Sequence, residues 1–197
     1  MRVLIPIVAL VAAGTAAAQT PQTASGPTTT AAAARRYEKI AEKELPGLRT
    51  VRLSDFSFPN PFGDSSNKPF DPRKHYPQAI PFQPPVTADL DGDGHRDFAL
   101  VMRARETRPN LGFYVVACLW RKLGYDCRRI SRQLDTGIST DRLEVGDLSN
   151  DSRCWGDRKK RTWKAPTLML DPYLGNIVTT YPYDKARDKF HWCDFGD

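Results

Sequence analysis

Residues 113–130 read FYVVACLWRKLGYDCRRI, a long apolar run followed by a shorter alternating one. Aromatic and β-branched residues dominate the first run, which is typical of a strand, and residues 122–124 supply a turn that ends in glycine. A hairpin centred on this turn, between residues 122 and 123, places Cys118 directly opposite Cys127. Opposed residues in an antiparallel pair share a face, at a Cα separation that a disulfide accepts. The sequence therefore predicts an antiparallel hairpin with a Cys118–Cys127 bridge.

Two further cysteines, Cys154 and Cys193, remain for a second bridge. No two of the four cysteines show the close Cys-x-x-Cys spacing of a structural zinc site, so disulfides are the favoured use. A register slip of one residue in the hairpin would put Cys118 and Cys127 on opposite faces and favour another of the connectivities.

Outward from the hairpin, the chain continues in short apolar or alternating runs divided by Gly, Pro, Asn and Asp. No gap between these runs contains a convincing crossover helix, which indicates antiparallel pairing. Upstream, apolar residues at helical spacing extend from residue 35 to Pro46. The predicted fold class is α+β, with an N-terminal amphipathic helix packed on a twisted antiparallel β-sheet meander. The predicted strands are residues 98–102, 113–120, 127–134, 143–145, 167–170, 177–181 and 190–195.

The remaining segments complete the domain plan. Residues 1–18 have a positive start, an apolar run and small residues before Gln19, which predicts a signal peptide. Residues 19–34 lack bulky apolar side chains and are predicted to form a flexible leader. Residues 35–197 then form a single globular domain, in which the proline- and aromatic-rich residues 46–85 are expected to wrap the domain as a long loop. A composition of 40% apolar and 26% charged residues excludes a multi-span membrane protein.

Acidic residues concentrate in the segment Asp-Leu-Asp-Gly-Asp-Gly-His-Arg-Asp, residues 89–97, which we call the Asp loop. Its four carboxylates would repel one another unless a cation neutralised them. Calcium fits best, because it accepts six to eight oxygen ligands in flexible geometry. An EF-hand requires a glutamate at position twelve, where this chain has Leu100, and the flanking residues 86–88 and 98–101 are strand-like. The predicted metal ligands are Asp89, Asp91, Asp93, His95 through its carbonyl, and Asp97.

The pattern Asp-x-Asp-x-Asp-Gly-x-x-Asp between strands resembles the calcium loops of the FG-GAP and VCBS repeats over residues 86–101. Those families repeat the unit several times, whereas this sequence contains it once. Residues 175–178 and 189–194 also resemble the closing hairpin of small exported bacterial proteins that carry a single such loop. The resemblance implies a Ca²⁺ site formed by the Asp loop.

The residues favour binding over catalysis, since the sequence has no Gly-x-Ser-x-Gly, phosphate-loop or His-Glu-x-x-His motif. The predicted function is a calcium-binding, disulfide-stabilised exported bacterial module of the periplasm, cell envelope or medium. Its expected partner is a protein or an anionic envelope polymer, for which the basic run 158–161 is one candidate contact. We expect a monomer, no nucleic acid, and no membrane association after signal cleavage. Two alternatives stay open: an envelope hydrolase with Asp97 or Asp194 as a base, and a periplasmic inhibitor or immunity-type protein.

Overall fold

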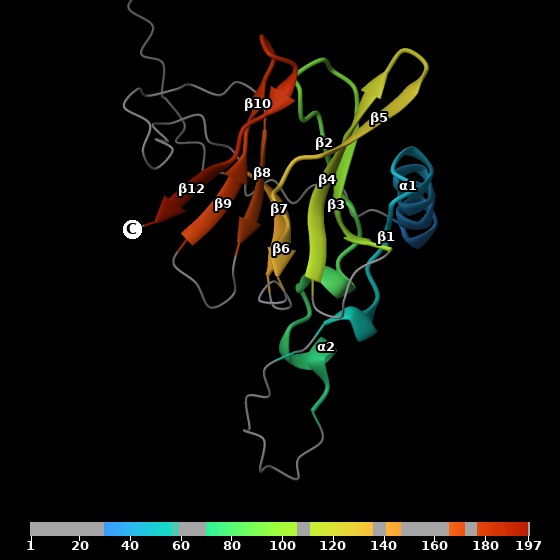
Figure 1. The fold of residues 1–197 in the computed structure, drawn as a ribbon, viewed down its shortest axis with the longest axis vertical. Helices are drawn as coiled ribbons and strands as arrows, with labels where there is room; N and C mark the ends of the chain where they lie inside the picture. Colours follow the sequence, from blue (N-terminus) through green and yellow to red (C-terminus); the bar gives the residue numbers. More distant parts are fainter. Residues whose placement is uncertain are drawn as a thin grey trace, which may run out of the picture.

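The computed structural model describes residues 30–56, 58, 70–105, 111–135, 141–146, 166–171 and 177–196. In these residues one longer helix lies on one face of a six-stranded sheet, and a four-stranded sheet lies on the other side (Figure 1). All strand pairs are antiparallel, so the fold class is broadly α+β. The expectation of one meander is wrong, because the strands divide between two sheets and a small hairpin.

The six-stranded sheet contains the predicted hairpin at its centre. Its strands run in the order β1-β3-β4-β5, while β2 also pairs with β3 and β6 with β4. Their bounds are β1 (Leu48–Thr50), β2 (Val86–Ala88), β3 (Asp97–Ala104), β4 (Leu111–Arg121), β5 (Gly124–Arg129) and β6 (Leu134–Asp135).

The four-stranded sheet has the order β12-β9-β8-β7. The predicted strand 190–195 is split here, because its first residue pairs in a separate hairpin and residues from Cys193 onward pair with β9. The bounds are β7 (Arg142–Gly146), β8 (Thr167–Asp171), β9 (Ile177–Tyr181) and β12 (Cys193–Gly196), and the separate hairpin consists of β10 (Tyr183–Asp184) and β11 (Lys189–Phe190).

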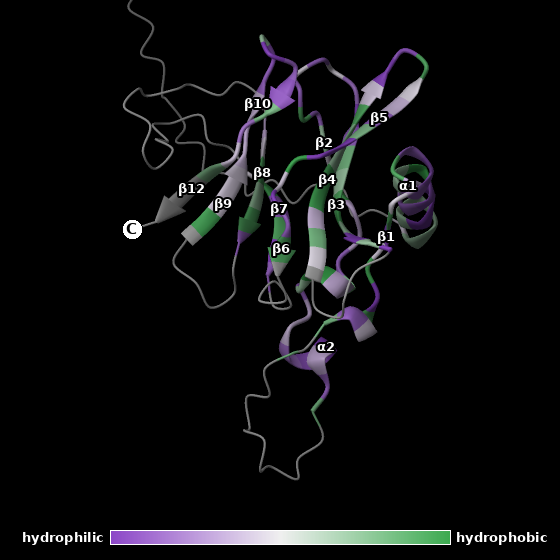
Figure 2. Cartoon of the chain, viewed as in Figure 1, coloured by the Kyte–Doolittle hydropathy of each residue, from purple (hydrophilic) through white to green (hydrophobic). Residues whose placement is uncertain are grey.

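Strands β3 and β4 are apolar on both faces, which explains their uninterrupted hydrophobic runs. In β3, Phe98 and Met102 belong to the cluster under the helix, whereas Ala99 and Val101 belong to the core shared with the second sheet. This alternation follows from the two-residue period of a strand. Figure 2 shows the resulting contrast between the hydrophobic central strands and the hydrophilic β10–β11 hairpin.

The helix α1 (Ala31–Glu44) begins inside the segment that the sequence predicted to be a flexible leader. Alanine has the highest helix propensity, so residues 31–34 extend the helix at little cost. The Thr30 hydroxyl accepts a hydrogen bond from the Ala33 amide at 3.3 Å and caps the first turn. Ala34 and Ala41 are buried against the sheet, whose contacts with α1 come mainly from β1 and β5.

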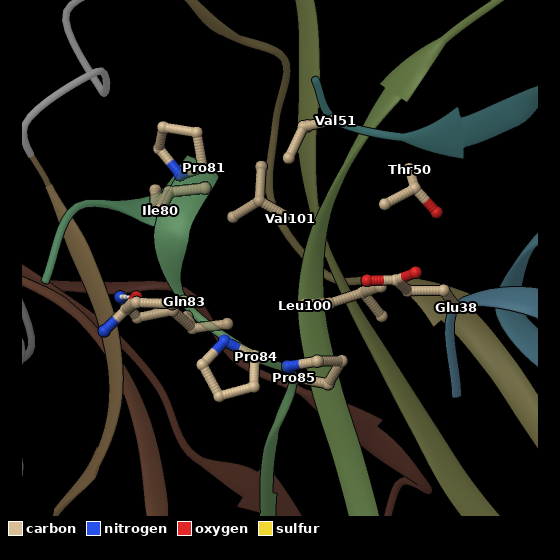
Figure 3. Close-up of a pocket in the computed structure, with 11 residues that line it drawn as sticks. Glu38, Thr50, Val51, Ile80, Pro81, Gln83, Pro84, Pro85, Leu100 and Val101 are labelled. Carbon is tan, nitrogen blue, oxygen red and sulfur yellow. Dashed lines mark hydrogen bonds between the residues drawn. The ribbon is translucent and has the colours of Figure 1, made fainter. Parts of the chain in front are cut away.

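The segment predicted as a wrapping loop, residues 46–85, contains regular structure in the part that the structure describes. Besides β1, it includes the short helices η1 (Leu53–Asp55), α2 (Pro72–His75) and η2 (Ile80–Phe82). Aromatic residues anchor it, as Phe56 packs against Phe113 with tilted rings whose centroids are 4.8 Å apart. A cavity of about 60 Å³ lies where the segment meets α1 and β3, too small for a metabolite (Figure 3). The predicted long loop is therefore wrong for β1 and these helical turns, while residues 57 and 59–69 lie outside the described part.

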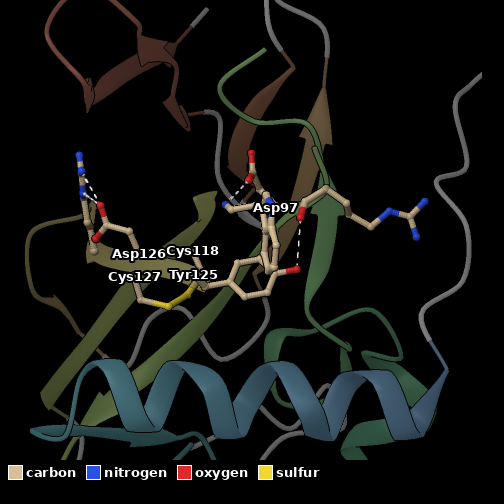
Figure 4. The surroundings of a disulfide bond; sticks show 8 residues. Asp97, Cys118, Tyr125, Asp126 and Cys127 are labelled. Atoms are coloured by element: carbon tan, nitrogen blue, oxygen red, sulfur yellow. Dashed lines mark hydrogen bonds and ion pairs between the residues drawn. A yellow bond between two sulfur atoms is a disulfide. The ribbon is translucent and has the colours of Figure 1, made fainter. Parts of the chain in front are cut away.

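The hairpin register agrees with the sequence prediction. Cys118 lies opposite Cys127 and Trp120 opposite Tyr125, because the turn falls at Lys122 and Leu123. A disulfide joins Cys118 and Cys127, with a Cα separation of 3.9 Å (Figure 4). Cys193 is also disulfide-bonded. Its predicted partner, Cys154, lies outside the described residues, so that bridge stays a prediction.

Candidate metal site

The Asp loop connects β2 to β3 at the point where these strands pair. Ala88 lies opposite Asp97, so the loop leaves and re-enters the sheet at neighbouring positions. Gly92 and Gly94 have φ values of 70° and 88°, a left-handed conformation that glycine adopts without a Cβ clash. The predicted flanking strands are confirmed, and the two glycines allow the chain to fold back on itself.

Three of the five predicted ligands converge in the loop. Asp89, Asp91 and Asp97 each offer one carboxylate oxygen, and these oxygens all lie within 4.8 Å of one another. The side chains of Asp91 and Asp97 are buried, and that of Asp89 is partly buried. The Asp93 carboxylate does not belong to this group, and the His95 carbonyl ligand stays a prediction. An all-oxygen group of carboxylates suits a hard divalent cation.

Backbone amides of the loop hold the carboxylates in place. Asp89 accepts hydrogen bonds from the amides of Asp93 at 3.0 Å and Gly94 at 2.9 Å. Asp91 accepts a further bond from the Asp93 amide at 3.1 Å, and Asp93 accepts one from the His95 amide at 2.8 Å. The loop is thus ordered by bonds between its own side chains and backbone, which leave each carboxylate oxygen a second lone pair.

Asp97 links the loop to the central strand. Its two oxygens accept hydrogen bonds from the Leu90 amide and the Trp120 amide, both at 2.7 Å. Burial and the nearby charges of Asp91 and Asp93 together raise the pKa of Asp97 to about 6, against the lowering effect of these two bonds. A cation bound beside Asp97 would relieve this accumulation of negative charge.

Arg121 is a site residue that the sequence did not single out. Its guanidinium forms an ion pair with Asp91 and lies 3.9 Å from an oxygen of Asp93. It also contacts Asp188 at 3.2 Å and the Tyr183 hydroxyl at 3.3 Å, both from the β10–β11 hairpin. Arg121 offsets one of the four carboxylate charges of the loop, and with Arg96 in the loop and Lys185 at the Gly92 carbonyl the site keeps a small net negative charge.

The β10–β11 hairpin contacts the Asp loop. The Lys185 ammonium donates a hydrogen bond to the Gly92 carbonyl at 3.4 Å. Asp188 also accepts a hydrogen bond from Tyr183 and forms an ion pair with Arg128 of β5 at 2.9 Å. The contacts of the hairpin with Gly92, Arg121 and Arg128 join residues sixty or more positions apart in the chain, which is why no local motif indicates them.

Two predicted candidates remain, a base at Asp194 and the basic run 158–161. The side chain of Asp194 and the basic run 158–161 lie outside what the structure describes. No helix within the described residues is long and apolar enough to cross a membrane. No protein family model, curated protein or solved structure matches this chain.

Proposed function

We propose that this protein is a calcium-binding, disulfide-stabilised module that bacteria export to the periplasm, cell envelope or medium, where it binds a partner rather than transforming one. The observation that carries the proposal is the convergence of the Asp89, Asp91 and Asp97 oxygens in a loop of excess negative charge. Calcium is favoured over magnesium because magnesium prefers to keep its water, whereas calcium accepts several carboxylates in irregular geometry.

A binding role is favoured over hydrolysis by the surroundings of Asp97. A general base must lie within hydrogen-bond reach of the substrate proton that it removes. Asp97 has no exposed surface, and both its oxygens are held by backbone amides. A buried carboxylate of this kind suits a metal ligand and a hydrogen-bond acceptor for the backbone better than a catalytic base.

Calcium is expected to stabilise the fold. At a free concentration a hundredfold above the dissociation constant, binding contributes about 2.7 kcal/mol to the free energy of unfolding. For a domain of this size, that gain raises the melting temperature by about 5–10 °C. The measurement is a pair of thermal melts, one in excess calcium and one in chelator, and identical melts would contradict the proposal.

Single substitutions distinguish the calcium-dependent shift in melting temperature from a general loss of stability. Asp91→Asn removes a carboxylate charge from the converging group and is expected to abolish most of the calcium shift. Asp171→Asn makes the same chemical change at an ion pair with Arg142, outside the loop, and is expected to leave the shift unchanged. Magnesium in place of calcium is expected to give a smaller shift.

Export predicts a defined N-terminus. The apolar run and the small residues at 16–18 predict cleavage after residue 18, so the mature chain begins at Gln19. The Cys118–Cys127 disulfide agrees with an oxidising compartment. Intact-mass spectrometry of the exported product measures the N-terminus, and a product that retains residues 1–18 in a membrane fraction would refute the assignment.

A further inference from the structure

Helix α1 separates its charges onto two sides. On the side toward β1, Glu42 accepts a hydrogen bond from the Thr50 amide at 2.7 Å and pairs with Arg105 at 3.5 Å. The outer side carries four exposed cations, which we call the basic row. None of them forms an ion pair with another described residue. The row consists of Arg35, Arg36, Lys39 and Lys43.

The basic row destabilises helix α1. Arg35, Lys39 and Lys43 follow one another at intervals of four residues, and like charges at this spacing destabilise a helix by a few tenths of a kcal/mol per pair. Glu38 and Glu42 line a hollow on the β1 side of the helix together with Arg35 and Lys39, and the charge of Arg35 counteracts the rise in the pKa of Glu38 that burial causes. These carboxylates offset part of the repulsion along the row, but none of them forms an ion pair with it among the described residues, and a bound polyanion would reduce the repulsion further.

A groove lies between α1 and the β4–β5 turn, which are neighbours in Figures 1 and 4. Its volume is about 440 Å³, within the range of ligand sites. A second hollow of about 450 Å³ runs along the helix and shares Arg36, Ile40 and Lys43 with the groove. The two hollows form one continuous surface along the basic row, and its remaining lining comes from Ala32, Arg35, Lys39, Glu44, Trp120, Arg121, Leu123, Gly124, Tyr125 and Asp126.

The charge of this surface is positive. Of its two acidic side chains, Asp126 is held by Arg128 at 2.5 Å, which leaves Glu44 against the four cations of the basic row. A groove lined by one sign of charge attracts ligands of the opposite sign.

Trp120 supplies an aromatic wall. It follows Cys118 on the same face of β4, and its ring lies edge-on to Tyr125, with centroids 5.1 Å apart. Trp120 is partly exposed in the groove. Sugar rings pack their C–H faces on such aromatic surfaces, while charged substituents remain free to meet the cations of the helix.

We propose that the groove between α1 and the β4–β5 turn binds an acidic polysaccharide, with its carboxylates on the basic row and a sugar ring against Trp120. This inference rests on the binding role proposed above and does not require the metal. A lipid surface is disfavoured because the apolar side of α1, including Tyr37 and Ala41, is buried on the sheet, and an interfacial helix needs that side free. Leu123 is the one fully exposed apolar side chain on this surface among the described residues.

The test uses the disulfide-bonded mature chain and oligomers of polygalacturonate, with isothermal titration calorimetry as the measurement. Lys39→Glu with Lys43→Glu is expected to weaken binding by about tenfold or more, the effect of several surface charge contacts together. The matched control, Lys74→Glu with Lys189→Glu, has the same change in net charge at exposed lysines that do not line the surface, and is expected to bind within about twofold of the wild type.

Two further arms keep the result interpretable. Lys39→Gln with Lys43→Gln removes the charges without adding acidic repulsion to α1, and circular dichroism checks that each variant is folded. Trp120→Leu keeps an apolar side chain but removes the aromatic ring, and it is expected to weaken binding as well. Neutral dextran and phosphatidylglycerol vesicles are expected not to bind.

Several outcomes would overturn the assignment. Equal weakening by both lysine pairs would show an effect of net charge alone, and vesicle binding that depends on Lys39 and Lys43 would assign the surface to lipid. Absence of polygalacturonate binding by the wild type would also overturn it. The thermal melts with calcium and chelator do not depend on any of these three outcomes. A failure of the polysaccharide proposal is therefore distinguishable from a failure of the proposed calcium site.

Discussion

Asp55→Asn is expected to lower the free energy of unfolding by about 3–5 kcal/mol, because it removes the single carboxylate from a buried ion-pair cluster. Asp55 is 5% exposed at the end of η1. It accepts two hydrogen bonds from Arg49 at 2.6 Å, one from Arg103 at 2.5 Å and one from the Arg52 amide at 2.8 Å. The cluster joins η1 to β1 and β3, so its loss uncouples the start of the 46–85 segment from the sheet.

Chemical denaturation at pH 7 measures this loss. The control is Asp171→Asn, which breaks a partly exposed ion pair with Arg142 and is expected to cost less than about 1 kcal/mol. If both variants lost the same free energy of unfolding, burial of the Asp55 cluster would make no contribution to stability.

The same cluster predicts a pH dependence. Burial by itself raises the pKa of Asp55, but the bonds from Arg49, Arg52 and Arg103 outweigh it and lower the pKa to about 2. A lowered pKa means that the stabilising charge is fully present above pH 4 and is lost as the pH falls from about 4 towards 2. Wild-type protein is therefore expected to lose about 2 kcal/mol across this window that Asp55→Asn does not lose.

Asp97→Ala is expected to cost about 4 kcal/mol even in chelator, because it leaves two backbone amides without their acceptor. The Leu90 and Trp120 amides both donate to Asp97, and the Leu90 and Asp97 side chains are buried. The expected loss does not depend on metal, since it comes from the hydrogen bonds between Asp97 and the backbone.

Asp89→Ala provides the contrast, as Asp89 is only partly buried and accepts from exposed loop amides. Asp89→Ala is expected to abolish most of the calcium shift while costing little in chelator. Denaturation curves of both variants, with calcium and with chelator, measure the difference, and a chelated Asp97→Ala as stable as the wild type would contradict the assigned role.

The hairpin and the ends of the Asp loop were predictable from local sequence. A turn at residues 122–124 sets the register of β4 against β5, and the two-residue period of a strand then fixes which side chains share a face. The Cys118–Cys127 bridge follows from that register alone. The residue types of the Asp loop likewise predict a turn rich in carboxylates between two strands, because glycine and aspartate restrict the backbone locally.

Sheet membership was not predictable in this way. The run 190–195 has the composition of one strand, yet Phe190 pairs with Tyr183 in the small hairpin and Cys193 pairs with Thr180 in the second sheet. Periodicity indicates that a segment is extended, but its partner depends on which apolar faces the rest of the chain leaves to be covered. The single meander was wrong for this reason.

Local sequence by itself determined the hairpin register, its disulfide and the concentration of carboxylates at residues 89–97. Only the tertiary structure decided three other features. These are the contacts of Arg121 and Asp188 at the Asp loop, the Arg49–Asp55–Arg103 cluster, and the position of the basic row facing the β4–β5 turn. Contacts within a turn involve few backbone dihedrals, so short motifs specify them. Contacts between residues distant in the chain form only when the sheets and the helix pack together, and no short motif specifies that packing.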